Sequence, residues 1–219
     1  MRSFTGVLQA DAYSGFTPLY ADGRVLEAAC WAHARRKHYD VYAMDRSPTA
    51  AEALARIGKL YAIEREIRGQ PPAIRAEARR ARSAPLLADL RGWLSATYAS
   101  LSAKSPLANA IQYSLTRWTA LTRYIDDGRI EIDNNAAERA IRALVLGRRN
   151  YLFAGSDAGG ETAARLYSLV GSCRLNGIDP HVYLRHVLER IASHPINRIE
   201  ELLPWRVAAV LPVALSHAA

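Results

Sequence analysis

The sequence is poor in cysteine, with only Cys30 and Cys173 among its 219 residues. Two cysteines cannot build the disulfide framework on which small secreted domains depend, and so low a number suits a reducing cytosol. Long hydrophobic runs are also missing, because the longest apolar stretch, residues 207–215, contains Pro212 and is shorter than the ~20 residues that span a bilayer. The first six residues contain one basic residue and no apolar core, unlike a signal peptide. These absences predict a cytoplasmic protein with no membrane partner.

Acidic residues are fewer than basic ones, which gives the chain a strong positive charge. There are 21 Asp and Glu residues against 29 Lys and Arg residues, for a formal net charge of +8 and a pI near 9.8. A surplus of this size favours a polyanionic partner such as nucleic acid, although many basic domains bind none. Half of the residues are apolar and 23% are charged, which excludes an intrinsically disordered chain.

The spacing of apolar residues predicts a mostly helical chain with a small amount of strand. Short apolar runs predict strands at residues 6–10 and 25–30, and residues 129–132 form a further short strand or an extended link. Apolar residues three to four positions apart predict helices at residues 31–44, 47–69, 87–101, 105–125, 136–146, 161–175, 180–193 and 197–205. Residues 155–160 are predicted as a loop. Ser47, Ser105 and Asp179 each precede a proline, a pair typical of a helix N-terminus.

Two carboxylates stand where they could serve catalysis. Asp11 directly follows the first predicted strand, although a helix cap or turn residue would look the same. Glu138 could instead belong to a capping box with Asn135 or form an ion pair with Arg142, four residues on. It also lies beside the apolar stripe that includes Ile141, which we expect to be buried. A carboxylate at the edge of such a stripe can point into a cleft.

Asp11 and Glu138 flank the long helical stretch in the sequence, and a fold could bring them together. Carboxylate oxygens are the ligands that Mg²⁺ and other hard cations prefer. Two-metal phosphoryl transfer needs such a constellation, because ions about 3.5–4 Å apart activate the attacking oxygen and stabilise the leaving one. The pattern alone leaves both the catalytic and the structural interpretation of these residues open.

Cys30 and His33 lie three residues apart at the start of a predicted helix, before the basic run at residues 35–37. Such a pair shares a helix face and could supply half of a zinc site. The sequence offers no second pair with suitable spacing, because Cys173 is isolated and the other histidines are scattered. The interpretation that we favour is that Cys30 packs in the core, while His33 and the basic run face a polyanion or solvent.

Five longer motifs follow one another along the chain. They are residues 8–16 (LQADAYSGF), 30–37 (CWAHARRK), 132–142 (IDNNAAERAIR), 147–156 (GRRNYLFAGS) and 175–180 (LNGIDP). In this order they strongly resemble transposases of the bacterial insertion sequence 66 family. The closing stretch Asn197–Trp205 resembles the C-terminal element of that family, so the resemblance covers roughly residues 5–205.

The resemblance implies an RNase H-like catalytic domain of the DDE type, interrupted by a helical insertion. Such enzymes cut transposon ends with water and then join the freed 3′-hydroxyl to target DNA, using Mg²⁺ or Mn²⁺. By motif, Asp11 would be the second acidic metal ligand and Glu138 the third. Cys30 and His33 would match a Cys-x-x-His signature that supports the site. From their place in the sequence, and not from the resemblance, we expect the neighbouring Asn134 and Asn135 to orient Glu138 or cap its helix.

The same resemblance implies DNA as the partner, both as transposon ends and as target, in the bacterial cytoplasm at the nucleoid. Basic side chains near the motifs would then suit contacts with phosphates. We expect this role for Arg35, Arg36, Lys37, Arg139, Arg142, Arg148 and Arg149. A homo-oligomer or a mixed assembly with a full-length transposase is expected as well.

The chain departs from the family pattern at its start. The first catalytic Asp of the family should lie well before the second, yet only ten residues precede Asp11 and none is acidic. We therefore expect an N-terminally truncated fragment that binds metal weakly and is inactive by itself, since catalysis depends on fixed coordination geometry. The alternative is a non-catalytic DNA-binding or oligomerising module that modulates an intact transposase.

These inferences define the expected fold, which is α/β, mostly helical, with an incomplete RNase H-like domain and a large α-helical insertion. We expect a partial RNase H-like core at residues 1–45, the insertion at 46–128, a return to the core with the Glu138 helix at 129–175, a C-terminal helical element at 176–205 and a tail at 206–219.

Overall fold

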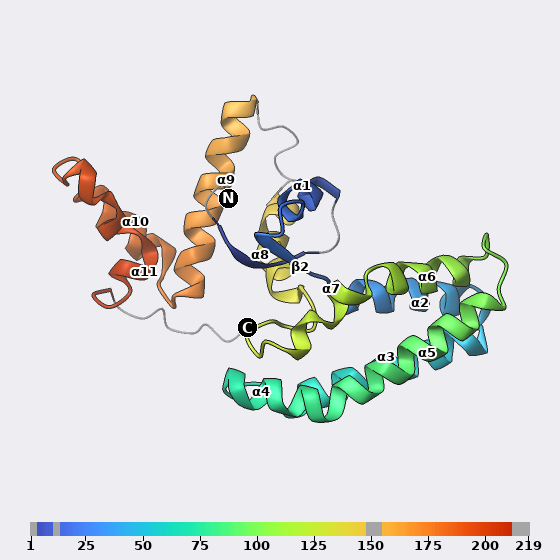
Figure 1. Cartoon of the computed structure of the whole chain (residues 1–219). Coiled ribbons are helices and arrows are strands. Elements are labelled where there is room, and N and C mark those ends of the chain that lie inside the picture. Colours follow the sequence, from blue (N-terminus) through green and yellow to red (C-terminus); the bar gives the residue numbers. More distant parts are fainter. Residues whose placement is uncertain (1–3, 11–13, 148–154, 212–219) are drawn as a thin grey trace. The chain divides into compact units, whose positions relative to one another are not determined.

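The computed structural model describes residues 4–10, 14–147 and 155–211, and the chain divides into two compact units, residues 1–137 and 138–219 (Figure 1). Helices dominate and one small sheet is present, which confirms the α/β, mostly helical class. The RNase H-like character of the fold remains a prediction. Every helix that the structure describes is too short or too polar to cross a lipid bilayer.

The first unit contains the sheet and most of the helices. Its elements are β1 (Gly6–Gln9), η1 (Ser14–Phe16), α1 (Thr17–Tyr20), β2 (Val25–Ala28), α2 (Trp31–Asp45), α3 (Pro48–Glu66), α4 (Pro72–Ala78), the π-helical η2 (Arg79–Ser83), α5 (Ala84–Ala99), α6 (Pro106–Thr116), α7 (Trp118–Thr122) and η3 (Arg123–Ile125). Helix α8 (Asn135–Gly147) begins in this unit.

The two strands pair in parallel, so their carboxyl ends lie side by side. Gly6 stands opposite Val25 and Gln9 opposite Ala28. The backbone N–H of Ala10 extends the ladder by donating to the Ala28 carbonyl oxygen, with an N–O distance of 3.0 Å. The chains that leave β1 and β2 therefore start from the same edge of the sheet.

Four long helices build the main hydrophobic core. Helix α2 packs against α3 and α6, and α5 packs against the same two helices (Figure 1). Leu60, Leu90 and Ile111 are completely or almost completely buried between them. Trp31, at the start of α2, belongs to the same core and packs edge-on against Trp118, with ring centroids 5.8 Å apart. The core of the helices is thus continuous with the end of the sheet.

Helix starts follow the predicted caps. The hydroxyl oxygens of Ser47 and Ser105 accept the N–H groups of Ala50 and Ala108, at 3.3 and 3.1 Å. The side-chain oxygen accepts a backbone N–H that has no partner within the helix. The proline that follows loses no hydrogen bond, because an N–H at this position would have no acceptor within the helix. The predicted starts of α3 and α6 are therefore confirmed.

The predicted helix over residues 105–125 is interrupted. Arg117 leaves helical geometry, with φ −104° and ψ 16°, and separates α6 from α7. The chain resumes at Trp118, which this break places against Trp31. The apolar stripe was correctly identified, but packing of two large rings overrides the continuity that the stripe suggests.

The second unit is helical, with α9 (Asp157–Leu175), α10 (Pro180–Leu188), η4 (Ile196–Leu202) and α11 (Pro204–Val207) after α8. Its small core contains Cys173, Ile178 and Tyr183, and the Tyr183 hydroxyl donates to the Leu202 carbonyl oxygen at 2.9 Å. Helix α9 begins within the predicted loop, because the Ser156 hydroxyl caps it. Helix α10 starts at the predicted Asp179 cap.

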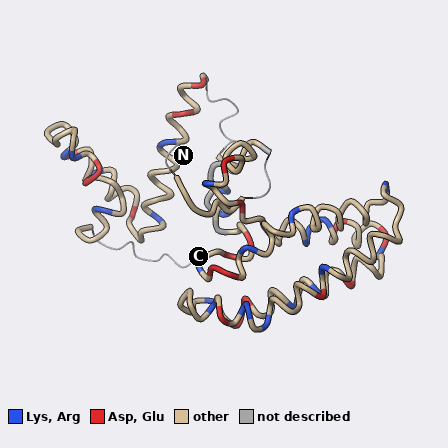
Figure 2. Tube along the Cα trace, in the orientation of Figure 1, with Lys and Arg blue, Asp and Glu red and all other residues tan. Residues whose placement is uncertain are grey.

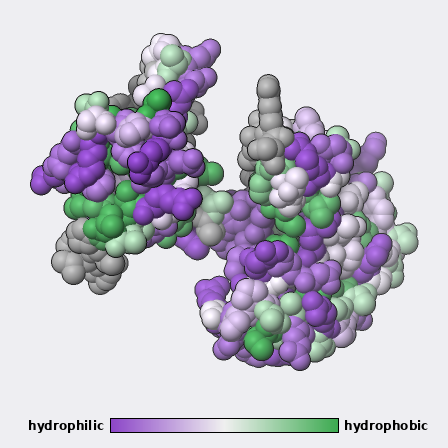
Figure 3. Space-filling view, turned by 60° about the vertical axis from the view of Figure 1, so that its left-hand side comes forward, coloured by the Kyte–Doolittle hydropathy of each residue, from purple (hydrophilic) through white to green (hydrophobic). Residues whose placement is uncertain are grey.

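Hydrophilic residues cover most of the protein face in view, between smaller apolar patches (Figure 3).

A buried ion pair joins α3 to η2. Arg79 is 0% exposed and Glu64 is 5% exposed. Arg79 donates from Nε and Nη2 to the two carboxylate oxygens of Glu64, each at 2.7 Å. Its Nη1 donates to three main-chain carbonyl oxygens, those of Tyr124, Asp127 and Ile130, at 2.8, 3.2 and 3.0 Å. All three guanidinium nitrogens have acceptors, which a charge at this depth requires.

We expect Arg79→Ala to lower the free energy of unfolding by about 3–5 kcal/mol, because it leaves the Glu64 carboxylate buried without its main partner. Urea denaturation followed by circular dichroism measures the loss. Arg82→Ala is the matched control, since the Arg82–Glu66 ion pair of the same segment is exposed and should contribute less than about 1 kcal/mol. Equal losses in the two variants would contradict the assignment.

His38 is a second buried polar residue, located between α2 and α6. Its side chain is 0% exposed, its Nε2 lies 3.4 Å from the Ser114 hydroxyl oxygen, and burial lowers its pKa from 6.5 to about 4. Between these two pH values the unfolded chain binds a proton at His38 that the folded chain does not bind. The free energy of unfolding therefore falls as the pH decreases through this window.

We expect this fall to reach about 3 kcal/mol between pH 6.5 and pH 4 for His38 alone. His38→Leu removes the titrating group, so its free energy of unfolding should change less over the same window, whatever its absolute value. Urea denaturation at a series of pH values gives both curves. Parallel curves for the two proteins would rule out the role of His38.

Candidate functional site

The segment at residues 130–134 is anchored at the carboxyl end of the sheet. Ile130 and Ile132 are buried. The Ile132 carbonyl oxygen accepts the N–H of Trp31 at 3.1 Å, and the Glu131 carbonyl oxygen accepts the Gln9 side-chain amide at 2.7 Å. Because Gln9 ends β1 and Trp31 comes shortly after β2, the ends of both strands meet the chain that leads into α8.

Asp133, Asn134 and Asn135 form the turn before α8. The Asn135 backbone N–H donates to the Asp133 carboxylate at 3.2 Å, and the Asn134 backbone N–H donates to the Cys30 sulfur at 3.2 Å. A carboxylate that accepts a backbone donor at this position favours the start of a helix. The roles of the two asparagine side chains in orienting Glu138 or capping its helix stay predictions.

Cys30 is a core residue, as predicted. It is 1% exposed, and burial raises the pKa of its thiol. Without a bound metal ion, the thiol therefore stays protonated at neutral pH. His33 is half-buried on the same helix. The Cys30 sulfur thus contacts the segment before α8 by accepting the Asn134 N–H.

The structure describes one of the two carboxylates that were predicted to be catalytic. Asp11 lies outside the described residues. Glu138 lies in the first turn of α8 and is exposed. The expectation that Ile141 is buried is wrong, because 54% of it is exposed, as is 55% of Val145. These two apolar side chains of α8 are therefore left largely uncovered.

The residues predicted to contact DNA are exposed wherever they are described. Arg35, Arg36 and Lys37 are exposed on α2, and Arg139 and Arg142 on α8, while Arg148 and Arg149 lie outside the described ranges. The Lys37 ammonium lies 4.7 Å from the centre of the Tyr113 ring, a favourable cation–π distance. Basic and acidic residues are interspersed along the helices (Figure 2).

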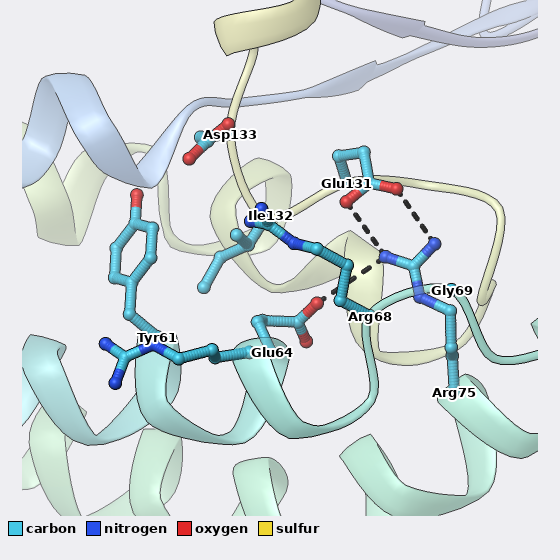
Figure 4. Close-up of a pocket in the computed structure, with 9 residues that line it drawn as sticks. Tyr61, Glu64, Arg68, Gly69, Arg75, Glu131, Ile132 and Asp133 are labelled. Carbon is cyan, nitrogen blue, oxygen red and sulfur yellow. Dashed lines mark hydrogen bonds and ion pairs between the residues drawn. The ribbon is translucent and has the colours of Figure 1, made fainter.

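A cavity of about 380 Å³ lies beside Asp133, between α3, α4 and the segment at residues 131–133 (Figure 4). Arg75 closes one side. Its guanidinium donates to both Glu131 carboxylate oxygens, at 2.8 and 2.9 Å, and lies 3.5 Å from Glu64. The hydrogen bond with Glu131 raises the pKa of Arg75. The arginine thus ties α4 to the segment that precedes α8.

Tyr61 forms another side of the cavity, and its hydroxyl points toward Asp133 (Figure 4). Burial, and after it the Asp133 carboxylate, raises the pKa of the Tyr61 hydroxyl. The phenol therefore stays protonated at neutral pH and can donate a hydrogen bond. Arg65 and Arg68, from the end of α3 and the turn after it, also line this space.

Sequence reasoning missed Glu64, Arg79 and the cavity. The sequence does contain a signal for Arg79. This residue precedes Ser83 by four positions and Leu87 by eight, so it extends the stripe of buried leucines in α5 toward the N-terminus. Glu64 likewise follows Leu60 on the buried stripe of α3. A charged residue on each of two apolar stripes indicates a buried ion pair, since one alone is too costly to bury.

Comparison with known families agrees with the motifs. Residues 1–162 match the sequence profile described as "Transposase IS66 family", and residues 168–205 match that of the "IS66 C-terminal element". The second match lies within the compact helical unit that contains α9, α10 and α11. Both matches follow the order expected from the motifs.

The curated relatives are longer proteins. The chain is 44% identical to the uncharacterized protein y4jD and 42% identical to the uncharacterized protein y4hP, both of Sinorhizobium fredii. Each comparison covers 94% of this chain but only 42% and 40% of the respective relative. A 49-residue stretch is 45% identical to the uncharacterized protein YuaK of Escherichia coli and covers 22% of this chain and 52% of YuaK.

The chain thus spans about two fifths of the length of its two S. fredii relatives. No solved structure is significantly similar to it. The family match nevertheless extends over most of the sequence and includes the segment anchored at the sheet. The chain therefore belongs to the IS66 family of transposases.

Proposed function

We propose that this chain carries part of an RNase H-like, DDE-type site for DNA transposition, in which DNA strands are cleaved and then transferred. Family membership supports a role in transposition. The observation that carries the proposal is the anchoring of residues 130–134 at the carboxyl end of the sheet. Asp11 comes just after β1 in the sequence, and Glu138 lies in the first turn of the helix that follows the anchored segment.

The proposed donor set fits a hard divalent cation. Asp11 and Glu138 offer carboxylate oxygens, which Mg²⁺ and Mn²⁺ prefer to sulfur ligands. Such a cation, when bound, would activate the attacking oxygen and stabilise the leaving one. Glu138 is exposed, and Cys30 contacts the chain just before its helix.

The 219 residues by themselves are proposed to be inactive. DDE chemistry, as implied by the family resemblance, uses three carboxylates, and no Asp or Glu precedes Asp11 in this sequence. With two of three ligands the coordination geometry is not fixed, and metal binding is weak. A polypeptide that supplies another carboxylate would complete the site.

A second function is favoured by two observations, the net charge of +8 and the exposed apolar side chains Ile141 and Val145 on α8. Together they suit a DNA-binding or oligomerising module that modulates an intact transposase through mixed assembly. This alternative needs neither metal nor cleavage.

We expect the purified chain to leave DNA that carries the ends of its element uncut in Mg²⁺ or Mn²⁺, as measured on denaturing gels. When a segment with the additional carboxylate is supplied, metal-dependent cleavage should appear and should disappear in Glu138→Gln. Glu161→Gln is the control, since Glu161 is an exposed glutamate of α9 paired only with Arg165 among the described residues. Metal-dependent cutting by the 219 residues alone that Glu138→Gln removes would contradict the proposed inactivity.

The modulating module makes a different prediction. In cells with an intact IS66-family transposase, producing this chain should change the transposition frequency, and Glu138→Gln should leave that change intact. A frequency that stays constant would count against the alternative.

A further inference from the structure

The cavity beside Asp133 has the chemistry of an anion site. Arg65 and Arg68 line it, and both residues are exposed. Within the described part of the chain, neither guanidinium has a hydrogen-bond or ion-pair partner. The Arg68 side chain extends from the turn after α3 toward Ile132 (Figure 4). Two arginines at the mouth of one cavity, each with its donors available, form a strongly anion-attracting arrangement.

The acidic residues of the cavity are mostly neutralised. Glu64 is held by Arg79 from the buried side, with both oxygens engaged at 2.7 Å. Glu131 is held by the two-pronged contact with Arg75. Each of these carboxylates is paired with its own guanidinium, so the electrostatic repulsion that it exerts on an incoming anion is reduced.

The balance that faces the opening is therefore positive. The two positive charges of Arg65 and Arg68 exceed the one negative charge of Asp133. The Tyr61 hydroxyl is buried and points toward Asp133 (Figure 4), so it faces that carboxylate and not the opening. The cavity thus offers two guanidinium groups, which proteins use to bind phosphate oxygens.

We propose that this cavity binds a backbone phosphate of a DNA strand, held by Arg65 and Arg68. The inference rests on the proposed function for the identity of its partner, but it requires neither Asp11 nor Glu138. It assigns DNA contact to α3 and the turn that follows it, a part of the chain to which the motifs gave no role.

A polymer suits this place better than a small anion, because basic side chains continue beyond the cavity. Arg35, exposed on α2, is close enough to Tyr61 to oppose the rise of its pKa. A DNA backbone presents phosphates at regular intervals, so one group can enter the cavity while its neighbour meets Arg35. A free phosphate would use only the cavity.

The test is DNA binding by fluorescence anisotropy in EDTA, with the full chain and a labelled duplex and single strand of one sequence. We expect Arg65→Gln with Arg68→Gln to weaken binding about tenfold at low salt. The slope of log affinity against log salt should become shallower by about 1, as for one lost phosphate contact. Circular dichroism checks that both proteins are folded.

The matched control is Arg91→Gln with Lys104→Gln, which removes two positive charges from the same unit at residues that do not line the cavity. It should weaken binding far less. Asp133→Asn gives a prediction of opposite sign, because it removes the negative charge facing the phosphate while keeping an oxygen for the Asn135 N–H. We expect tighter DNA binding, whereas a purely structural role of Asp133 would loosen it.

The outcomes separate this inference from the proposed function. DNA binding that is equally weakened in the cavity variant and the control overturns the inference and leaves the function standing. A wild-type chain that binds no DNA overturns the inference, whereas the proposed function is tested by cleavage with the additional segment supplied. Calorimetry with inorganic phosphate is the second arm: phosphate binding that depends on Arg65 and Arg68, without any effect of these residues on DNA, replaces the DNA contact by a small-anion site and overturns the proposal.

Discussion

The buried Arg79–Glu64 ion pair is the interaction on which the rest of the first unit depends. The guanidinium binds a carboxylate of α3 and three carbonyl oxygens of the turn between Tyr124 and Ile130. That turn runs directly into the segment anchored at the sheet. A Cβ at Gly128 would overlap the Pro72 carbonyl oxygen, so the backbone of this turn packs directly against the backbone at the start of α4. The long helices and the end of the sheet are thus held together by buried polar contacts and close backbone packing.

In the proposed site, a long helical stretch separates Asp11 from Glu138 in the sequence. The helices between Asp11 and Glu138 also have a structural role. Through Arg75 and Glu131 they also hold the chain just before α8. If catalysis proceeds as proposed, the position of the Glu138 helix depends on residues more than fifty positions upstream. Side chains far from the reacting atoms then become positioning residues for the chemistry.

Much of the local structure follows from the sequence, because its causes are local. Ser47 and Ser105 cap helices through hydrogen bonds that span three residues, and proline fixes the first turn. The motifs also indicate the family correctly. What sequence reasoning misses is set by contacts between distant segments. The stripe of residues 105–125 does not reveal the break at Arg117, since that break serves the packing of Trp118 on Trp31. The cavity is assembled from α3, α4 and residues 131–133, and no single stretch of sequence contains it.

The π-helical segment at residues 79–83 has a consequence for how this protein can vary. A π-turn accommodates more residues per turn than the α-helix around it, and so it sets the rotational phase between α4 and α5. Each residue of an α-helix advances by about 100°. Deleting one residue from Arg79–Ser83 would let this segment become α-helical and would keep Arg79 and the leucines of α5 close to the same face. The wide turn therefore accommodates one additional residue without moving either of them out of the core.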